Sequence, residues 1–275
     1  NGVQPLLSVQ GLKTYFPTDE GLVRAVDGLS FDVFEGKTLG IVGESGCGKS
    51  TVGRAILGIV DKPGHIEAGS IIWRENPSEE GSEVIDLAKQ VPTGKLMRSI
   101  RGNFISLIFQ EPMTSFSPVH TIGNQLTEAI RLHQDLSKKE SYNRAEELLA
   151  QVGIPNPRQR LSEYSFQLSG GLRQRAMIAM ALSCDPKLLI ADEPTTALDV
   201  TTQAQILDLL RDLQEKNGMA VILITHNLGV IAEMADDVVV MYLGREAESG
   251  PVDDLFHNPQ HPYTQGLLRS IPSIY

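Results

Sequence analysis

The stretch GESGCGKST, at positions 43–51, combines glycines, a lysine and hydroxyl residues in an order suited to binding phosphate. It satisfies G-x-x-x-x-G-K-[ST] and lies between the apolar run KTLGIV and a stretch with a helical pattern. Glycines let backbone N–H groups turn toward phosphate oxygens, and the following helix start adds partial positive charge. We expect Lys49 to face the β- and γ-phosphates and Ser50 to offer its hydroxyl to Mg²⁺. A plain glycine-rich turn is the weaker alternative, because the flanking elements are those the motif needs.

Two carboxylates end the apolar run KLLIADEP, at positions 187–194. A buried strand tolerates charge only where it meets a metal, a partner or a ligand. We therefore predict that Asp192 contacts Mg²⁺, directly or through water, and that Glu193 polarises an attacking water. Taken alone, the pair also fits an acidic cap at a sheet edge. The phosphate loop in the same chain favours the catalytic interpretation.

A histidine and a glutamine close two further apolar runs. His226 ends VILITH, at the carboxyl end of a predicted strand, where ligands of open α/β sheets bind, so it could hydrogen-bond a γ-phosphate. Gln110 ends FISLIFQ and could ligate Mg²⁺ through its amide oxygen. Each signal is weak alone, because a histidine at a strand end is more often a structural cap and such glutamines are common in loops.

A second helix start could bind an anion. LSGGLRQR, at positions 168–175, places Ser169, Gly170 and Gly171 before an alanine- and methionine-rich run. Free N–H groups, a hydroxyl and the helix dipole make such a turn an anion site. A simple helix cap is the alternative, and it leaves the paired glycines unexplained.

Short apolar or β-branched runs recur along the chain and predict strands. They read LLSVQ, KTLGIVG, SIIW, FISLIFQ, KLLIAD, AVILITH and DVVVMYL. Helical patterns lie between several of them, which is typical of a mostly parallel sheet covered by helices. We therefore expect an α/β fold.

Two segments near the start of the chain depart from this alternation. LSVQGLKTYF and VRAVDGLSFDVF are joined by a turn containing Pro17, Asp19 and Gly21, which predicts an antiparallel pair. Residues 74–100 are polar and punctuated by Pro and Gly, so they are expected to form a surface excursion between strands.

Two helices are predicted from their ends. Ser137 followed by Glu140 makes a capping box, after which Ala145, Leu148, Leu149 and Val152 fall on one face. Residues 200–217 predict a helix that ends at Asn217-Gly218.

Composition limits the classes of function. The 275 residues fit one large domain or one with a smaller insertion, and 34 acidic against 24 basic residues argue against broad nucleic-acid binding. Cys47 and Cys184 are too few for a disulfide framework, so a reducing compartment is expected. The apolar runs are too short to cross a bilayer, and the residues that follow Asn1 do not predict a secretory leader.

The order of these motifs resembles that of the nucleotide-binding subunit of an ATP-binding cassette (ABC) transporter. Along the chain they are the phosphate loop, Gln110, LSGGLRQR, LLIADEP, the ALD of residues 197–199 and His226. The resemblance covers essentially the whole chain. It implies a RecA-like phosphate-loop core with a mostly parallel sheet, an N-terminal antiparallel β subdomain and an inserted helical subdomain. The implied boundaries are 1–36 for the β appendage, 37–110 and 169–250 for the core, 111–168 for the helical subdomain and 251–275 for the tail.

The resemblance implies ATP and Mg²⁺ as ligands, and a head-to-tail dimer in which the LSGG turn of one subunit covers the γ-phosphate held by the other. Leu172 stands where the family more often has glutamine, but Ser-Gly-Gly is kept. Tyr15 matches the aromatic residue that stacks on adenine, with Phe16 as the alternative. Thr51 matches the hydroxyl near the α-phosphate, and Asp199 the loop that couples the two sites.

These implied roles define the whole candidate site. Nucleotide contacts are expected from Tyr15, Gly43, Glu44, Ser45, Gly46, Cys47, Gly48, Lys49, Ser50, Thr51, Ser169, Gly170, Gly171 and Asp199. Catalytic roles are expected for Lys49, Gln110, Glu193 and His226, and Mg²⁺ contacts for Ser50, Gln110 and Asp192.

The C-terminal stretch NPQHPYTQGLL, at positions 258–268, is similar to the tail of the oligopeptide, dipeptide and nickel importer branch. The resemblance then implies an ATPase that energises uptake of peptides or a related small solute from the cytoplasmic face of the membrane. It implies two transmembrane permease subunits and, indirectly, an extracytoplasmic solute-binding protein. A Pro-punctuated turn before a helix is the alternative for this stretch. Because the cysteines of the cluster-binding members do not follow, no iron–sulfur cluster is expected.

Two other functions remain as alternatives. A soluble ABC ATPase that acts on nucleic acid or ribosomes usually carries two cassettes or long coiled-coil insertions, and neither is found in this sequence. A small-molecule kinase could use the same phosphate loop, but it would leave LSGG, Glu193 and His226 without roles.

Overall fold

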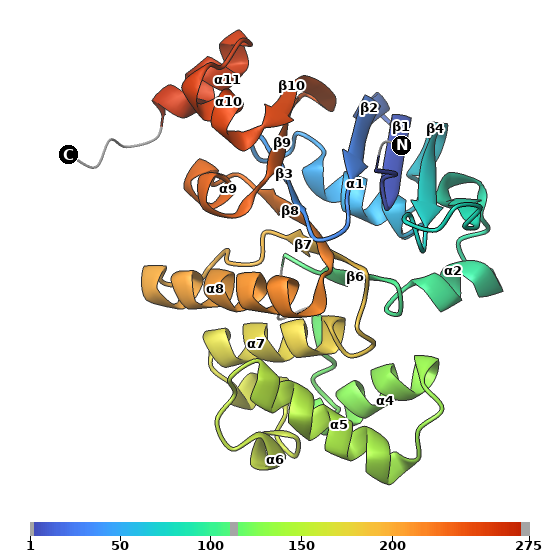
Figure 1. Ribbon diagram of the computed structural model, residues 1–275, viewed down its shortest axis with the longest axis vertical. Coiled ribbons are helices and arrows are strands. Elements are labelled where there is room, and N and C mark those ends of the chain that lie inside the picture. Colours follow the sequence, from blue (N-terminus) through green and yellow to red (C-terminus); the bar gives the residue numbers. More distant parts are fainter. Residues whose placement is uncertain (1–2, 111–114, 271–275) are drawn as a thin grey trace. The chain divides into compact units, whose positions relative to one another are not determined.

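The computed structural model describes residues 3–110 and 115–270. The chain divides into two compact units (Figure 1). Asn1–Arg98 with Gly218–Tyr275 form the first, here named the loop unit because it contains the phosphate loop. Ser99–Asn217 form the second, here named the helical unit. Each unit is described separately.

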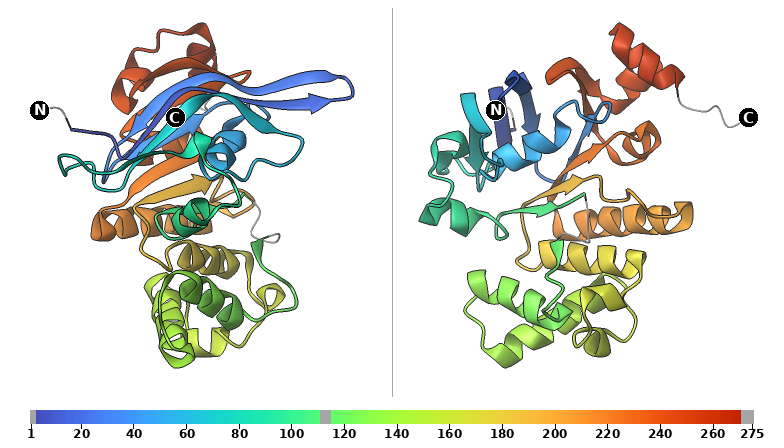
Figure 2. Two further views of the ribbon diagram at one scale, coloured as in Figure 1. Left: turned by 90° about the vertical axis from the view of Figure 1, so that its right-hand side faces the viewer. Right: turned by 180° about the vertical axis from the view of Figure 1, so that it is seen from behind.

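The N-terminal sheet of the loop unit is antiparallel, with strand order β2-β1-β4-β5. Its strands are β1 (Leu7–Thr18), β2 (Gly21–Val33), β4 (His65–Arg74) and β5 (Val84–Asp86). β1 and β2 form a long hairpin (Figure 2) that turns between the paired residues Thr18 and Gly21. This hairpin is the antiparallel pair that the sequence predicts. Leu12, Leu29 and Trp73 of this sheet are buried and form part of the core.

Parallel strands make the second sheet of the loop unit. They are β3 (Thr38–Val42), β8 (Ala220–Thr225) and β9 (Asp237–Tyr242), with β10 (Arg245–Pro251) antiparallel to β9. Every residue of β3 and β8 is buried, as expected of strands covered on both faces. Helix α1 (Lys49–Ile56) contacts β8, and α9 (Leu228–Met234) contacts both β3 and β8.

Residues 74–100 hold more structure than the predicted surface excursion. They contain β5, the 3₁₀ turn η1 (Leu87–Lys89) and α2 (Lys95–Ile100). Leu87 and Met97 are buried, so these two apolar residues attach an otherwise polar stretch to the core. Beyond β10 the chain forms α10 (Val252–His257) and α11 (Pro262–Arg269).

The helical unit contains two parallel strands and several helices. The strands are β6 (Ile105–Ile108) and β7 (Leu188–Asp192). The helices are α4 (Ile122–His133), α5 (Lys138–Gln151), α6 (Pro157–Arg160), η2 (Ser165–Gln167), α7 (Gly170–Ala181) and α8 (Val200–Asn217). The predicted capping box of Ser137 and Glu140 is confirmed at the start of α5, and α8 ends as predicted before Gly218.

Every run that predicts a strand overlaps one, but β10, like the short β5, was not predicted. Its sequence, REAESGP, is polar and mostly exposed, so it lacks the apolar alternation by which strands are found. The implied domain boundaries stay predictions. Three ranges at the edges of the predicted appendage, helical subdomain and tail lie outside the described residues, namely 1–2, 111–114 and 271–275.

Candidate active site

The phosphate loop joins β3 to α1 within the loop unit. Gly48 precedes α1 in a left-handed conformation, with φ of 97°. A Cβ atom at this position would lie 2.0 Å from the carbonyl oxygen of Ala25, so only glycine fits. The other side of the loop is open, since Glu44, Ser45 and Gly46 are exposed. The phosphate loop is therefore packed against Ala25 where it enters α1, while Glu44, Ser45 and Gly46 at its tip are accessible to a ligand.

Lys49 is buried within this loop. Its Nζ donates hydrogen bonds to the carbonyl oxygens of Gly43, at 2.7 Å, and Glu44, at 2.9 Å. These acceptors satisfy an ammonium group that is only 5% exposed. Burial raises the pKa of the neighbouring Cys47 thiol, whose sulfur lies 3.8 Å from the same Nζ. The loop thus keeps one positive charge in place, which suits a polyphosphate ligand.

The β9–β10 turn supports the loop from behind. The Gly244 N–H donates to the carbonyl oxygen of Cys47 at 3.1 Å, and the Asp27 N–H donates to the carbonyl oxygen of Gly244 at 2.7 Å. The Glu44 N–H donates to the Tyr263 hydroxyl of α11 at 3.1 Å. Of the residues in these contacts, Glu44 and Cys47 of the loop were predicted as nucleotide contacts. Asp27, Gly244 and Tyr263 were not, because they are distant from the loop in sequence.

Tyr15 belongs to a hydrogen-bonded group in the loop unit. Its hydroxyl donates to Asp27 Oδ1 at 2.7 Å, while the Arg245 guanidinium donates to Asp27 Oδ2 at 3.1 Å and 2.7 Å. These two partners hold the pKa of Asp27 below its ordinary value, and the bond to Asp27 raises the pKa of Tyr15. The Arg24 Cζ lies 5.7 Å from the centroid of the Tyr15 ring. The alternative aromatic, Phe16, has its ring directly against Gly64.

His226 lies at the same edge of the sheet as the phosphate loop. In the parallel pair of β3 and β8, Val42 is the partner of Thr225. The next residues along the chain are Gly43 and His226, so both leave the sheet at its carboxyl edge. His226 is exposed there. The loop unit therefore brings together the phosphate loop and the predicted histidine.

Asp192 and Glu193 end β7 in the helical unit, and each is 7% exposed. Glu193 has a φ of 48°, a left-handed backbone conformation that glutamate rarely adopts. Its Oε2 accepts a hydrogen bond from the Thr196 hydroxyl at 3.1 Å. Ile108 of β6 is the partner of Ala191 of β7, so residues that follow these strands leave at one edge. Gln110 is exposed at that edge.

The LSGG turn starts α7, as the sequence predicts. Ser169 is the N-cap, and its Oγ accepts a hydrogen bond from the Leu172 N–H at 3.3 Å. A Cβ atom on Gly171 would lie 2.9 Å from Thr202 Cγ2, so close packing against α8 accounts for this glycine. Gly170 has only an ordinary contact, at 3.9 Å, so packing does not require it. Both Ser169 and Gly170 are exposed.

Asp199 acts locally as a helix cap. Its carboxylate accepts hydrogen bonds from the Thr202 N–H, at 2.9 Å, and the Thr202 hydroxyl, at 2.7 Å. These bonds lower the pKa of Asp199. The neighbouring Val200 is 86% exposed although it is apolar. Asp199 is therefore fixed in orientation beside an uncovered apolar side chain.

The expected magnesium ligands offer a hydroxyl, an amide oxygen and a carboxylate, from Ser50, Gln110 and Asp192. Oxygen donors of this kind suit Mg²⁺, which takes few protein ligands and completes its shell with phosphate oxygens and water. Across residues 3–110 and 115–270, no group of three or more His, Cys, Asp or Glu side chains could hold a metal ion. Each of the three donors is of a kind that Mg²⁺ accepts, and their role as ligands stays a prediction.

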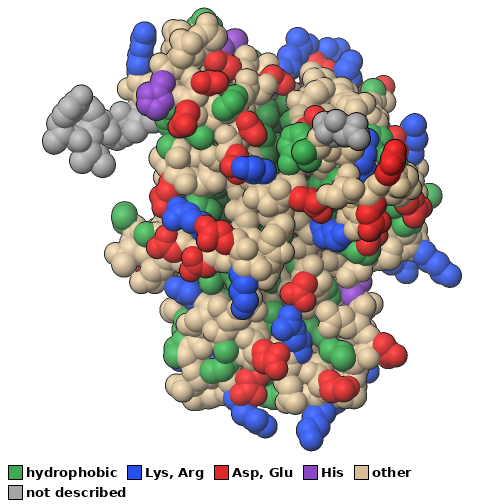
Figure 3. Space-filling model, viewed as in Figure 1, with side chains coloured by type: hydrophobic (Ala, Val, Ile, Leu, Met, Phe, Trp, Pro, Cys, Tyr) green, Lys and Arg blue, Asp and Glu red, His purple; other side chains and the backbone are tan. Residues whose placement is uncertain are grey.

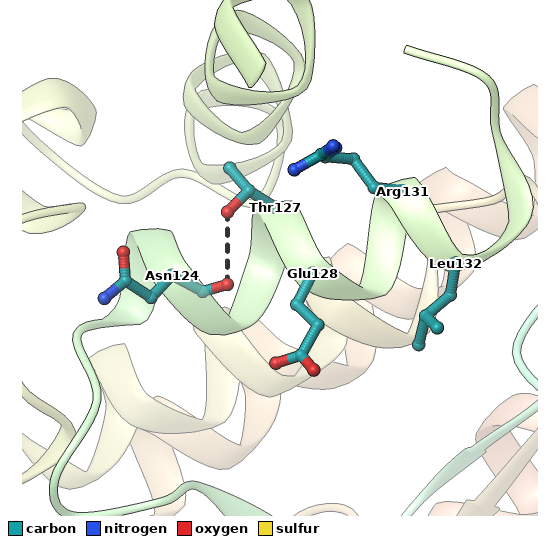
Figure 4. Close-up of a pocket in the computed structure, with 5 residues that line it drawn as sticks. All are labelled: Asn124, Thr127, Glu128, Arg131 and Leu132. Carbon is teal, nitrogen blue, oxygen red and sulfur yellow. Dashed lines mark hydrogen bonds between the residues drawn. The ribbon is translucent and has the colours of Figure 1, made fainter. Parts of the chain in front are cut away.

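A shallow depression of about 310 Å³ lies along α4 in the helical unit (Figure 4). It is lined by Asn124, Thr127, Glu128, Arg131 and Leu132. The Thr127 hydroxyl is turned to the helix itself, where it donates to the carbonyl oxygen of Asn124 at 3.1 Å. With one acidic and one basic residue, this depression lacks the concentrated positive charge of the phosphate loop.

A phosphate loop between a strand and a helix, on an α/β chain with a second exposed helix start at LSGG, is the arrangement expected of an ATP-binding cassette, a class of phosphate-loop ATPase. The chain belongs to the ABC transporter family, whose model matches residues 26–196. A second model, the oligopeptide/dipeptide transporter C-terminal region, matches residues 247–275. ATP is therefore the nucleotide that this cassette binds and hydrolyses.

Similar proteins carry peptide transport names. The dipeptide transport ATP-binding protein DppD of Bacillus subtilis strain 168 is 50% identical over 273 residues, covering 99% of this chain and 78% of DppD. The oligopeptide transport ATP-binding protein AppD of the same strain is 52% identical over 270 residues, covering 98% of this chain and 79% of AppD. A Brucella melitensis biotype 1 protein, provisionally named for peptide import, is 53% identical over 272 residues, covering 98% of this chain and 79% of that protein.

The fold is that of solved ABC cassettes. A dimeric structure of the ABC transporter cassette MJ0796 is 24% identical, has a TM-score of 0.76 and covers 90% of this chain and 98% of that one. This likeness confirms the α/β fold expected from the sequence. Within the described residues, no helix combines the length and apolar character needed to cross a membrane.

Proposed function

We propose that this chain is the ATPase subunit of an importer for peptides or a related small solute. The observation that carries the proposal is the C-terminal segment, where residues 247–275 match the oligopeptide/dipeptide transporter region. The names of DppD and AppD, each about half identical along nearly this whole chain, support the same solute class.

In this proposal the loop unit binds ATP. Tyr15 stacks on adenine, Lys49 neutralises the β- and γ-phosphates, and the Thr51 hydroxyl lies near the α-phosphate. The support is that Lys49 is buried and held by loop carbonyls, while the tip of the loop stays exposed. Of the remaining loop residues, Gly43 and Ser45 to Gly48 contribute backbone N–H groups and Ser50 a hydroxyl, whereas the Glu44 N–H is bonded to the Tyr263 hydroxyl.

Glu193 and His226 position the attacking water in this proposal. Both follow strands at a carboxyl edge, where ligands of α/β sheets bind. Glu193 is held by Thr196 in an uncommon backbone conformation, as is typical of functional positions. Bound Mg²⁺, held by Ser50, Gln110 and Asp192, would supply charge neutralisation on the phosphates.

A second cassette, identical or related, completes the site head to tail. Ser169, Gly170 and Gly171 of one subunit then cover the γ-phosphate held by the other, and Asp199 couples the two sites. Ser169, Gly170 and Val200 support this arrangement because all three are exposed and no described residue covers them. ATP binding closes such a dimer, and hydrolysis with phosphate release reopens it.

Two transmembrane permease subunits would receive this motion at the cytoplasmic face of the membrane, through Gln110 and the predicted helical subdomain. An extracytoplasmic solute-binding protein would deliver the solute to them. The nucleic-acid alternative is disfavoured by the charge of −10. Basic side chains are also interspersed with acidic ones over the face shown in Figure 3.

The test is to tag the full chain, purify it from solubilised membranes and identify what accompanies it. We expect multi-span membrane proteins and, after reconstitution into vesicles, ATP-driven uptake of labelled di- and oligopeptides. Lys49→Ala should abolish both phosphate release and uptake, whereas Lys216→Ala, at an exposed position on α8, should change neither. Co-purification of ribosomes or nucleic acid without membrane proteins would overturn the proposal.

A further inference from the structure

The segment that follows β10 returns to the phosphate loop. Tyr263, in the first turn of α11, accepts a hydrogen bond on its hydroxyl oxygen from the Glu44 N–H at 3.1 Å. Glu44 is the second residue of the loop, and the two residues are 219 positions apart. Both belong to the loop unit. This contact gives the C-terminal segment a direct link to the site of ATP binding.

The peptide group between Gly43 and Glu44 is held at both ends. Its carbonyl oxygen, from Gly43, accepts from Lys49 Nζ at 2.7 Å, and its N–H, from Glu44, donates to Tyr263. A peptide group is planar, so fixing the direction of the N–H also fixes the direction of the carbonyl. Hydrogen bonds on both ends of one amide also polarise each other. The tyrosine hydroxyl therefore influences where the lysine ammonium lies.

Tyr263 itself is held from several sides. Its ring lies 4.5 Å, centroid to centroid, from that of Tyr242 at the end of β9. Its N–H donates to His261 Nδ1 at 3.1 Å, which caps α11. The Glu248 carboxylate of β10 accepts from the N–H groups of Gln260, at 2.7 Å, and His261, at 2.9 Å. The segment thus presents the hydroxyl in a fixed position.

We propose that Tyr263 is a positioning residue for the phosphate loop: by holding the Gly43–Glu44 peptide group, it keeps Lys49 in place for the β- and γ-phosphates of ATP. This inference rests on the proposed role of Lys49, but it does not depend on which solute is transported. The C-terminal segment then has a task in the nucleotide site of the same chain.

Tyr263→Phe tests the proposal, because it removes the hydroxyl and keeps the ring. We expect the Kd for MgATP to rise about three- to ten-fold, the range for loss of one hydrogen bond, while AMP, which lacks the phosphates that Lys49 faces, is bound as before. In steady state, the KM for ATP should rise more than kcat falls.

Tyr242→Phe is the matched control. Among the hydrogen bonds of residues 3–110 and 115–270, none involves the Tyr242 hydroxyl, so its removal should leave MgATP affinity unchanged. Equal effects of the two substitutions, or an equal loss of MgATP and AMP binding by Tyr263→Phe, would overturn the proposal. These measurements need only the isolated chain, so they are independent of whether peptide uptake is found.

A measurement on the unaltered protein guards against a variant that folds poorly. The Glu44 amide hydrogen should exchange slowly with solvent in the nucleotide-free chain, although Glu44 is exposed, because it is bonded to Tyr263. Fast exchange of this amide, at the rate of an unprotected loop residue, would show that the contact is not maintained and would refute the proposal.

Discussion

The phosphate loop and the LSGG turn are both helix starts, but different kinds of contact hold them. The phosphate loop is fixed by partners far along the chain, such as Gly244 and Tyr263. The LSGG turn is fixed by near neighbours: Ser169 caps Leu172, and Arg173 donates to the carbonyl oxygen of Leu168. One site is built into the core of its unit, and the other is presented from a single helix.

This difference agrees with a division of work. In the proposed function the phosphate loop binds the triphosphate, since the carbonyl oxygens of Gly43 and Glu44 already hold the Lys49 ammonium in place. The LSGG turn has no charged residue and remains exposed, so in the same proposal it stabilises a ligand that another phosphate loop brings. We therefore expect substitutions of Ser169 and Glu193, in the helical unit, to affect turnover. Substitutions of the residues that hold the phosphate loop and Tyr15, in the loop unit, should affect nucleotide binding.

Glu193→Gln should give the largest effect that separates ATP turnover from ATP binding. Removing the carboxylate that polarises water should slow ATP turnover about 10²- to 10⁴-fold, while MgATP binding stays near that of the unaltered chain. Bound ATP would then accumulate, so gel filtration with MgATP should show a larger fraction of dimer. Glu215→Gln, at an exposed position on α8, is the control and should change neither quantity. An unchanged elution volume for Glu193→Gln would count against the closed dimer.

Ser169→Arg should slow turnover about 10²-fold or more and leave MgATP binding nearly intact. The larger side chain would block the approach of a second phosphate loop, and the lost hydroxyl can no longer stabilise developing charge. Loss of the helix cap costs about 1 kcal/mol, so the melting temperature should fall only slightly. Ser162→Arg, exposed in the same unit, serves as the control. Loss of MgATP binding would mean that the turn is needed for folding instead.

Asp27→Asn should have a smaller effect, on binding and not on the chemical step. Tyr15 and Arg245 donate to different oxygens of the carboxylate, and in the amide one of these two positions is an NH₂ group that cannot accept. We expect the KM for ATP to rise about three- to ten-fold with little change in kcat. Asp32→Asn, exposed on the same strand, is the control. A fall in kcat without a change in KM would contradict the adenine-side role of Tyr15.

The same contrast explains what the sequence could and could not predict. Residues 43–51, Ser169 and Glu193 could be proposed from the sequence because their motifs are contiguous and their physics is local. Asp27, Arg245 and Tyr263 were missed because each acts through partners that only the fold brings near. Strand β10 was missed for a related reason, since its polar sequence is stabilised by pairing with β9 and not by its own apolar pattern. One glycine of the LSGG turn, Gly171, also proved to be required by packing against Thr202.

His133, at the end of α4, should give the smallest effect, a pH dependence specific to the helical unit. Partial burial lowers the pKa of His133 below its ordinary 6.5, so the unfolded chain binds a proton more readily than the folded one. The contribution of His133 to the free energy of unfolding is then fully present above pH 6.5. It decreases as the pH falls from there toward the lowered pKa of His133 in the folded chain. His133→Gln should flatten this dependence. Amide exchange of α4 and α5 between pH 7 and pH 5.5 measures it, and exchange in the loop unit should be unaffected by the substitution. Equal pH dependence in both proteins would show that His133 is not the group responsible.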